Sequence, residues 1–182
     1  HDVGKLHAPN WFIENQDGAK NPHDEIDDPL KSAEILQAHV DQGLKFARKN
    51  RLPKPIANFI PEHQGTLKMG YFLNKAEEKK LKFNESDFRY KGPIPQSKET
   101  AILMLADGCE AALRAMDINA SDYEALETIS KIVDSRQVDG QLNDSNLSKG
   151  EIFLIKKSFL NVWKRIRHRR IQYPTTKNNT FS

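Results

Sequence analysis

Apolar residues in this chain recur every three or four positions between Pro- and Asn-rich stretches, which is the pattern of amphipathic helices. The clearest stripe lies in residues 97–116 and consists of Ile102, Leu105, Cys109, Ala112 and Met116. No stretch alternates apolar and polar residues for long enough to indicate a sheet. The pattern therefore predicts an all-α fold.

Local start and stop signals set the expected helix boundaries. Helices are expected over residues 1–6, 31–50, 55–63, 71–81, 97–116 and 121–137, and from residue 148 onward. Ser148 with Glu151 three positions later is a capping box, and Ser97 is an N-cap residue type. The stretches 14–29 and 88–96 are rich in turn residues, so they are predicted to be loops.

The length and composition indicate one soluble domain. The chain has 182 residues, of which 37% are hydrophobic and 29% charged, ordinary values for a globular domain. We expect this domain to span residues 1–174 and to be followed by a disordered tail at 175–182. No apolar run approaches the roughly 18 to 20 residues that cross a bilayer. The net charge of +3 is too small to indicate a DNA or RNA partner.

The first residue and the single cysteine add two expectations. The chain begins with His1 rather than Met, so we expect a fragment or a processed product whose first helix, at residues 1–6, is truncated at its N-terminus. No signal peptide opens it. Cys109 has no partner for an internal disulfide, which fits a reducing compartment.

Asp107 follows the apolar run 101–106 (AILMLA) on the most apolar of the expected helices. A buried carboxylate costs folding free energy unless it is paired or bound to a metal. The alternative is an Asp on the polar side of the helix, or one in a salt bridge with a neighbouring helix. Asp107 alone does not decide between these interpretations.

His39 and His63 lie on or beside the apolar faces of two different expected helices. A lone histidine in such a place is usually a core residue whose hydrogen bonds are satisfied. Two such histidines, a carboxylate in an apolar helix and a His-Asp dipeptide together favour a metal site. Imidazole and carboxylate ligands without thiolates suit Fe, Mn, Zn or Mg.

His1-Asp2 is that dipeptide. Adjacent residues on a helix point about 100° apart, so they can serve two sides of a metal pair, and a carboxylate can bridge two ions where an imidazole cannot. The dipeptide alone is a weak signal, because a second copy, His23-Asp24, lies in a polar stretch flanked by Pro. We interpret the second copy as part of a loop.

Several short blocks together resemble one family of hydrolases. In chain order they are HDVGKL, FIENQDGAKNPHDEI, SAEILQAHVDQG, FIPEHQGT, FRYKGPIPQSKETAILMLADGCEAA, RQVDGQL and HRRIQYP. Their order is similar to that of the seven-transmembrane HD hydrolases, which include the PgpH-type cyclic di-AMP phosphodiesterases, and the likeness runs from His1 to Pro174. The resemblance implies an all-helical HD bundle at the cytoplasmic end of a membrane protein, with a homodimer as a possible assembly. The implied activity is hydrolysis of cyclic di-AMP to the linear dinucleotide by a metal-activated hydroxide.

The resemblance also implies a set of metal ligands. They are His1 and Asp2 of the HD motif, His39 of AHVDQG, His63 of EHQGT and Asp107 of LADGCE. They would hold two divalent transition metal ions, with Fe or Mn expected, and Asp2 would be shared between the ions as a catalytic ligand.

Two positions beside these ligands are expected to contact substrate. Lys5, one helical turn from the HD pair, is a candidate cation for the phosphate in the transition state. Gln64 stands where the family usually has a second histidine, and it could donate a hydrogen bond to a phosphate oxygen. The family also takes a histidine from a helix before the HD motif, so one metal is expected to be under-coordinated here, which could leave the fragment itself inactive.

Two other functions stay open. HD domains include cyclic di-GMP phosphodiesterases and nucleotide phosphohydrolases, but the cyclic di-GMP class carries Gly-Tyr-Pro after its paired histidines, where this chain has Gly65-Thr66-Leu67. A degenerate HD domain could instead bind a nucleotide as a signalling module without catalysis. Gln64 keeps that alternative open.

Three further segments have no decided role. The block RQVDGQ, at residues 136–141, fits either a structural turn or a substrate contact. Tyr71 and Phe72 could stack on adenine, although core packing is the more ordinary interpretation. The basic run at residues 164–170 suits a helix C-terminus or a solvated face, and it could also meet anionic lipid headgroups.

Overall fold

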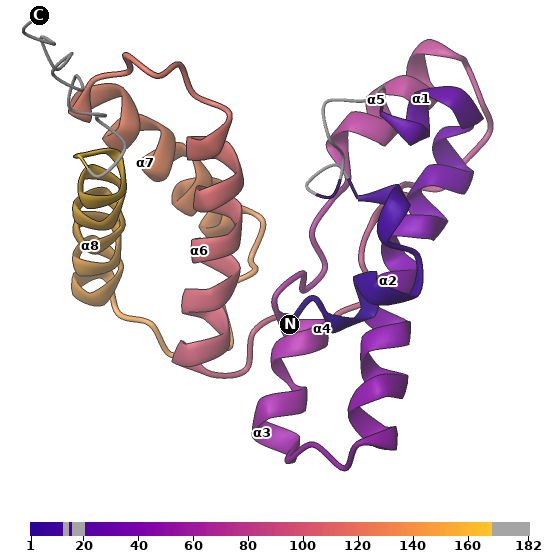
Figure 1. The fold of residues 1–182 in the computed structure, drawn as a ribbon, viewed down its shortest axis with the longest axis horizontal. Helices are drawn as coiled ribbons and strands as arrows, with labels where there is room; N and C mark the ends of the chain where they lie inside the picture. The colour runs from indigo at the N-terminus through magenta and orange to yellow at the C-terminus, as the bar shows by residue number, and fades with distance from the viewer. Residues whose placement is uncertain (13–14, 16–20, 169–182) are drawn as a thin grey trace, which may run out of the picture.

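The computed structural model describes residues 1–12, 15 and 21–168, and it is built from helices (Figure 1). In chain order these are η1 (Val3–His7), η2 (Pro9–Trp11), α1 (Pro22–Ile26), α2 (Pro29–Lys49), α3 (Lys54–Ala57), α4 (Phe59–Glu62), α5 (Gly70–Glu78), η4 (Glu85–Phe88), α6 (Lys98–Arg114), α7 (Asp122–Val138) and α8 (Lys149–His168). Within these described ranges, one isolated antiparallel bridge between Lys68 and Arg89 is the only strand-type pairing. The predicted all-α class is confirmed.

The helices form two groups, each around its own apolar core (Figure 1). One core lies among α6, α7 and α8 and contains Ala101, Met104, Leu105, Cys109, Ile129, Val133, Leu142 and Ile152. The other lies among α2, α5 and η4 and contains Ala33, Met69, Phe72, Leu73, Ala76 and Phe88. The N-terminus and α4 lie between the two groups (Figure 1).

The long helices begin where their capping residues predict. The backbone N–H of Thr100 donates to Ser97 Oγ at 3.2 Å at the start of α6. At the start of α8, Ser148 Oγ accepts from the backbone N–H of Glu151, and the Glu151 carboxylate accepts from the backbone N–H of Ser148. Each contact satisfies a backbone N–H that the first helical turn leaves unpaired, so the helix start is fixed by local sequence.

Three local predictions are wrong or incomplete. The stretch 14–29 was expected to be a loop, but Asn21 caps a short helix, α1, by accepting from the backbone N–H of His23 at 3.1 Å. The expected helix 55–63 is two short helices that meet at Asn58. The first helix is a 3₁₀-helix, η1, that starts after Asp2.

His23-Asp24 is therefore helical, and our loop interpretation is wrong. The His23 ring is buried, with its Nε2 atom 3.0 Å from the Trp11 carbonyl oxygen. Asp24 instead faces outward and pairs with Lys75 at 2.6 Å. This second HD dipeptide ties α1 to its neighbours and lies outside the cluster described below.

None of the helices in the described part of the chain is both long and apolar enough to cross a membrane. The predicted disordered tail at 175–182 lies outside the described residues.

Candidate metal centre

The HD dipeptide is brought to the other predicted ligands by a close approach of η1 to α2. Gly4 is buried against α2, and a Cβ atom on it would overlap the backbone carbonyl oxygen of His39. Gly43, one turn further along α2, lies on the same contact. Only residues without a side chain allow the two backbones to come this close. His1 and Asp2, which precede η1, consequently sit beside His39.

Asp2 is at the centre of the cluster. Its Oδ1 atom lies 3.4 Å from His63 Nε2 and 3.8 Å from His39 Nε2. Its Oδ2 atom lies 3.2 Å from His1 Nε2 and 2.8 Å from Lys5 Nζ. The two carboxylate oxygens thus face different sets of partners.

Asp107 joins the cluster from α6. Its Oδ1 atom is 3.8 Å from His1 Nε2. Two groups of potential ligand atoms result, one from His1, His63 and Asp107 and one from Asp2, His39 and His63, each with its atoms within 4.8 Å of one another. The Asp107 side chain is 38% exposed, so it is less buried than its apolar helix suggested.

The tautomers of His39 and His63 follow from their backbone contacts. His39 Nδ1 lies 2.5 Å from the Leu36 carbonyl oxygen, and His63 Nδ1 lies 2.6 Å from the Ile60 carbonyl oxygen. Because a carbonyl oxygen can only accept, each Nδ1 must carry the proton. In its neutral form each ring then turns the lone pair of Nε2 into the cluster, as histidine ligands of metals do.

Burial and hydrogen bonding set the charges of the ligands. Burial lowers the pKa of His39 to about 4, so this ring is neutral near pH 7. Burial alone would raise the pKa of Asp2, but hydrogen bonds from neighbours that include His1 and Lys5 bring it well below its ordinary value. The pKa of His1 is raised, chiefly by its hydrogen bond to Asp2. The cluster thus holds an ionised carboxylate facing neutral imidazole.

These residues fit a divalent cation. Asp2 Oδ1 is buried and has no hydrogen-bond partner within the described ranges. The Nε2 atoms of His39 and His63 are 3.4 Å apart, and both are acceptors if Nδ1 holds the proton. A buried anion and two lone pairs converging on one point are unfavourable without a cation to receive them. The donor set, nitrogen and oxygen without sulfur, suits Fe, Mn or Zn.

Lys5 lies at this cluster, and Gln64 is next to one of its residues in the chain. Lys5 pairs with Asp2 and also stands over the Phe12 ring at 5.2 Å from its centroid. Gln64 directly follows His63 and is partly buried. The cluster therefore brings together the five predicted ligands, with Lys5 beside them.

Glu62 is a functional residue that the sequence interpretation missed. Its side chain is buried, and Oε2 accepts hydrogen bonds from the backbone N–H of Gln96 at 2.8 Å and from Thr100 Oγ at 2.7 Å. These bonds fix α4, and with it His63, against the start of α6. The only sequence signal was a carboxylate next to the histidine.

Gln141 gives the block RQVDGQ a structural role. Its buried amide accepts from the backbone N–H of Thr66 at 3.0 Å and donates to Thr66 Oγ at 2.8 Å. It also donates to Asp139, which is paired with Arg89 at 3.2 Å. The turn that follows His63 is therefore held by residues about 75 positions further along the chain.

The remaining candidate segments lie away from the cluster. Phe72 is a core residue, as its ordinary interpretation expected, whereas the Tyr71 ring is 54% exposed and its hydroxyl donates to Asp24. In the basic run, Lys164 pairs with Asp122 and Arg167 donates to two backbone carbonyl oxygens. Residues 169 and 170 of that run lie outside the described residues.

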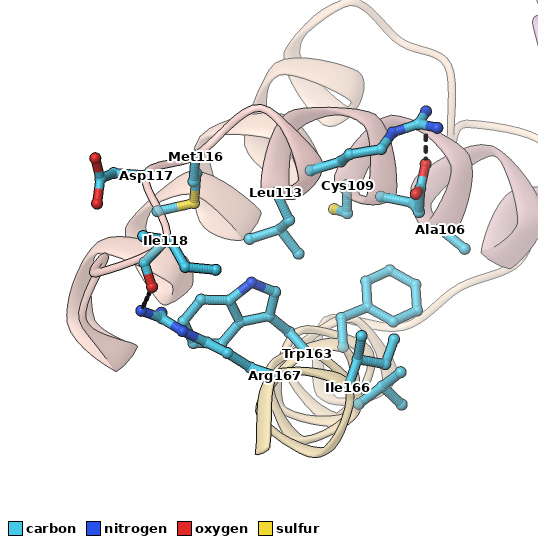
Figure 2. A pocket seen from close by; sticks show the side chains of 13 residues that line it. Ala106, Cys109, Leu113, Met116, Asp117, Ile118, Trp163, Ile166 and Arg167 are labelled. Carbon is cyan, nitrogen blue, oxygen red and sulfur yellow. Dashed lines mark hydrogen bonds and ion pairs between the residues drawn. The ribbon is translucent and has the colours of Figure 1, made fainter. Parts of the chain in front are cut away.

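A prominent pocket of about 430 Å³ lies between α6 and α8, and it contains none of the five predicted ligands (Figure 2). Its walls are apolar, with Cys109 and Leu113 from α6 facing Trp163 from α8, and Arg167 stacks over the Trp163 ring. The pocket holds none of the polar groups of the cluster, so it is separate from the candidate metal centre.

Comparison with known proteins assigns the chain to a family. Residues 1–112, which contain all five predicted ligands, match the HD domain. The chain belongs to the HD domain family. Among solved structures, the crystal structure of the HD domain of Listeria monocytogenes phosphodiesterase PgpH in complex with cyclic-di-AMP aligns with a TM-score of 0.86 at 35% identity, over 91% of this chain and 77% of that one. The predicted HD bundle is thereby confirmed.

Two curated relatives match almost the whole HD chain. An uncharacterized protein of Synechocystis is 47% identical over 179 residues, and the cyclic-di-AMP phosphodiesterase PgpH of Listeria monocytogenes is 36% identical over 178 residues. The alignments cover 96% and 98% of this chain but only 22% and 24% of the relatives. The chain thus spans about a quarter of the length of these relatives.

Proposed function

We propose that this HD domain is a metal-dependent phosphodiesterase that hydrolyses cyclic di-AMP to the linear dinucleotide. The observation that carries the proposal is the meeting of three histidines and two carboxylates from η1, α2, α4 and α6 around a buried carboxylate oxygen that has no partner among the described residues. The substrate is taken from the PgpH proteins that the chain resembles.

We assign the five residues to two divalent cations, with Fe or Mn as the expected metals. His39 and His63 would bind through Nε2, because their Nδ1 atoms donate to backbone carbonyls. Asp2 is suited to be shared, since its two oxygens face different partners. When bound, such cations activate a water molecule for attack on phosphorus and stabilise the negative charge that develops on the phosphate oxygens.

The chain's own residues then bind and orient the phosphodiester. Lys5, whose Nζ atom is 2.8 Å from Asp2, can favour charge on a phosphate oxygen next to the shared carboxylate. Gln64 can donate from its amide to another phosphate oxygen. A site on the cytoplasmic side of a longer, membrane-embedded protein, and a homodimer, remain predictions that accompany this proposal.

Turnover assays on the protein extended N-terminally by the helix that is expected to supply the further histidine test the proposal. After loading with Mn²⁺, Fe²⁺, Zn²⁺ or Mg²⁺, the protein is incubated with cyclic di-AMP and, separately, with cyclic di-GMP, and the products are separated by chromatography. We expect the linear dinucleotide from cyclic di-AMP with Mn²⁺ or Fe²⁺, and a loss of about 100-fold or more in kcat for His63→Ala.

His7→Ala is the matched control, because His7 lies on η1 next to the cluster yet is exposed and outside it. It should leave turnover unchanged. Faster turnover of cyclic di-GMP would instead favour the other class of HD phosphodiesterase. Tight binding of cyclic di-AMP without turnover under any of the four metals would favour a signalling module and contradict the proposal.

A further inference from the structure

Arg136 is a partly buried cation whose role the proposed chemistry leaves open. It lies on α7, its Nε atom is buried without a hydrogen-bond partner, and Nη1 makes one long contact of 3.3 Å to the neighbouring Ser135 hydroxyl. In the described ranges 1–12, 15 and 21–168, no carboxylate lies within the 4.0 Å of an ion pair with it. A guanidinium in that state loses hydration without gaining a partner.

The carboxylate nearest to Arg136 along the chain is already taken. Asp139 accepts from both Nη atoms of Arg89 and from the amide of Gln141. Arg89 also donates to Glu85 and to the Thr66 carbonyl oxygen, so every nitrogen of its guanidinium already has an acceptor. The contrast between the two arginines shows that Arg136 is not simply part of the network that holds the turn after His63.

Arg136 points toward the part of α6 that carries Asp107. A Cβ atom placed on Gly108 would lie 3.3 Å from Arg136 Nη2 and 3.3 Å from a methyl group of Ile132. The glycine that follows Asp107 therefore leaves room for the guanidinium against α6, one residue from this candidate metal ligand. Asp139 and, more weakly, Asp107 attract this cation electrostatically, although neither forms an ion pair with it.

We infer that Arg136 is a substrate-binding residue that contacts a phosphodiester anion of the dinucleotide. The inference rests on the proposed function for the identity of that substrate. A guanidinium presents its N–H groups in a planar fork that matches phosphate oxygens, and it stays charged when partly buried. The phosphate would supply the anionic partner that Arg136 lacks. Arg136 would contact this phosphate from α7, whereas Lys5 lies at the cluster on η1.

The test combines Arg136→Gln with Arg136→Lys, and uses Arg114→Gln as the matched control. Arg114 is on α6 and pairs on the surface with Glu110 at 3.0 Å. We measure the KM for cyclic di-AMP and, independently, the binding of inorganic phosphate to the Mn²⁺-loaded protein by calorimetry. Arg136→Gln should raise the KM and weaken phosphate binding by about tenfold or more, Arg136→Lys should lose less, and the control should match the wild type.

The metal content of each variant decides between contact and positioning. Unchanged metal content with weakened phosphate binding supports the inference. A fall in bound metal for Arg136→Gln would mean that Arg136 orients Asp107 and would overturn the inference. Phosphate binding equal to that of the wild type would mean that Arg136 does not contact phosphate, and it would also overturn the inference. If the wild type does not hydrolyse cyclic di-AMP, the proposed function fails, but the phosphate measurement still decides the role of Arg136.

Discussion

In the candidate metal centre, single hydrogen bonds fix which ring nitrogen of His39 and of His63 faces the cluster. The carbonyl oxygens of Leu36 and Ile60 accept hydrogen bonds from Nδ1 of His39 and Nδ1 of His63. These bonds direct both Nε2 atoms toward the cluster. The five candidate ligands could be named from sequence because blocks such as AHVDQG and LADGCE resemble a known family. Their tautomers could not, because each depends on a side-chain rotamer, although the carbonyl that accepts from Nδ1 is only three residues earlier. The state of Arg136 could not either, because it depends on atoms brought together by the fold.

Metal affinity should fall as the pH drops below neutrality, because protonation of His1 removes one of the ligands. A ligand must release its proton to bind a metal, and the ligand with the higher pKa is protonated first as the pH falls. The pKa of His1 is raised above its ordinary value of 6.5, whereas that of His39 is lowered to about 4. Mn²⁺ titrations by calorimetry between about pH 5 and pH 8 would measure this, and an affinity that stays constant down to about pH 5 would contradict it.

At the scale of helices, local signals predicted the long elements and failed for the short ones. Ser97 and Ser148 sit at helix starts because a side-chain cap needs only neighbouring residues. The five-residue helix α1 has a capping residue, Asn21, but it lies in a turn-rich stretch that hid the signal, and the break at Asn58 has no side-chain cap. Helices this short are stabilised by tertiary packing. The close approach of η1 to α2 is likewise visible only in the fold, although it depends on Gly4.

Gly4→Ala should displace η1 from α2 and weaken metal binding about tenfold or more, because the new Cβ atom would overlap the His39 carbonyl oxygen. Gly150→Ala in α8 is the matched control, since nothing lies within 4 Å of its Cβ position. That control should be neutral or slightly stabilising, as alanine favours a helix. Thermal melting and Mn²⁺ titration of both variants measure the two effects. Wild-type metal affinity in Gly4→Ala would show that η1 does not position the HD pair.

At the scale of the whole molecule, the cluster lies where the two groups of helices meet. His39 and His63 belong to α2 and α4, while Asp107 belongs to α6, and Glu62 ties α4 to α6 through Gln96 and Thr100. Each group has its own apolar core, so relatively few contacts join them. A metal that binds ligands from both groups would therefore cross-link the two groups of helices in addition to its catalytic role.

Metal binding should consequently stabilise the native protein, and Asp107 should be needed for the full effect. A ligand that binds only the folded state at 100 times its Kd adds about 2.7 kcal/mol to the free energy of unfolding. Asp107→Asn removes the ligand contributed by α6 and should reduce the rise in Tm that Mn²⁺ causes. Glu110→Gln, on the same helix but paired at the surface with Arg114, should keep it. The Tm of both variants is measured by calorimetry with and without a chelator. Equal metal-induced shifts in Tm would mean that the ion is bound by the group of α2 and α4 alone, so that Asp107 does not link the two groups of helices.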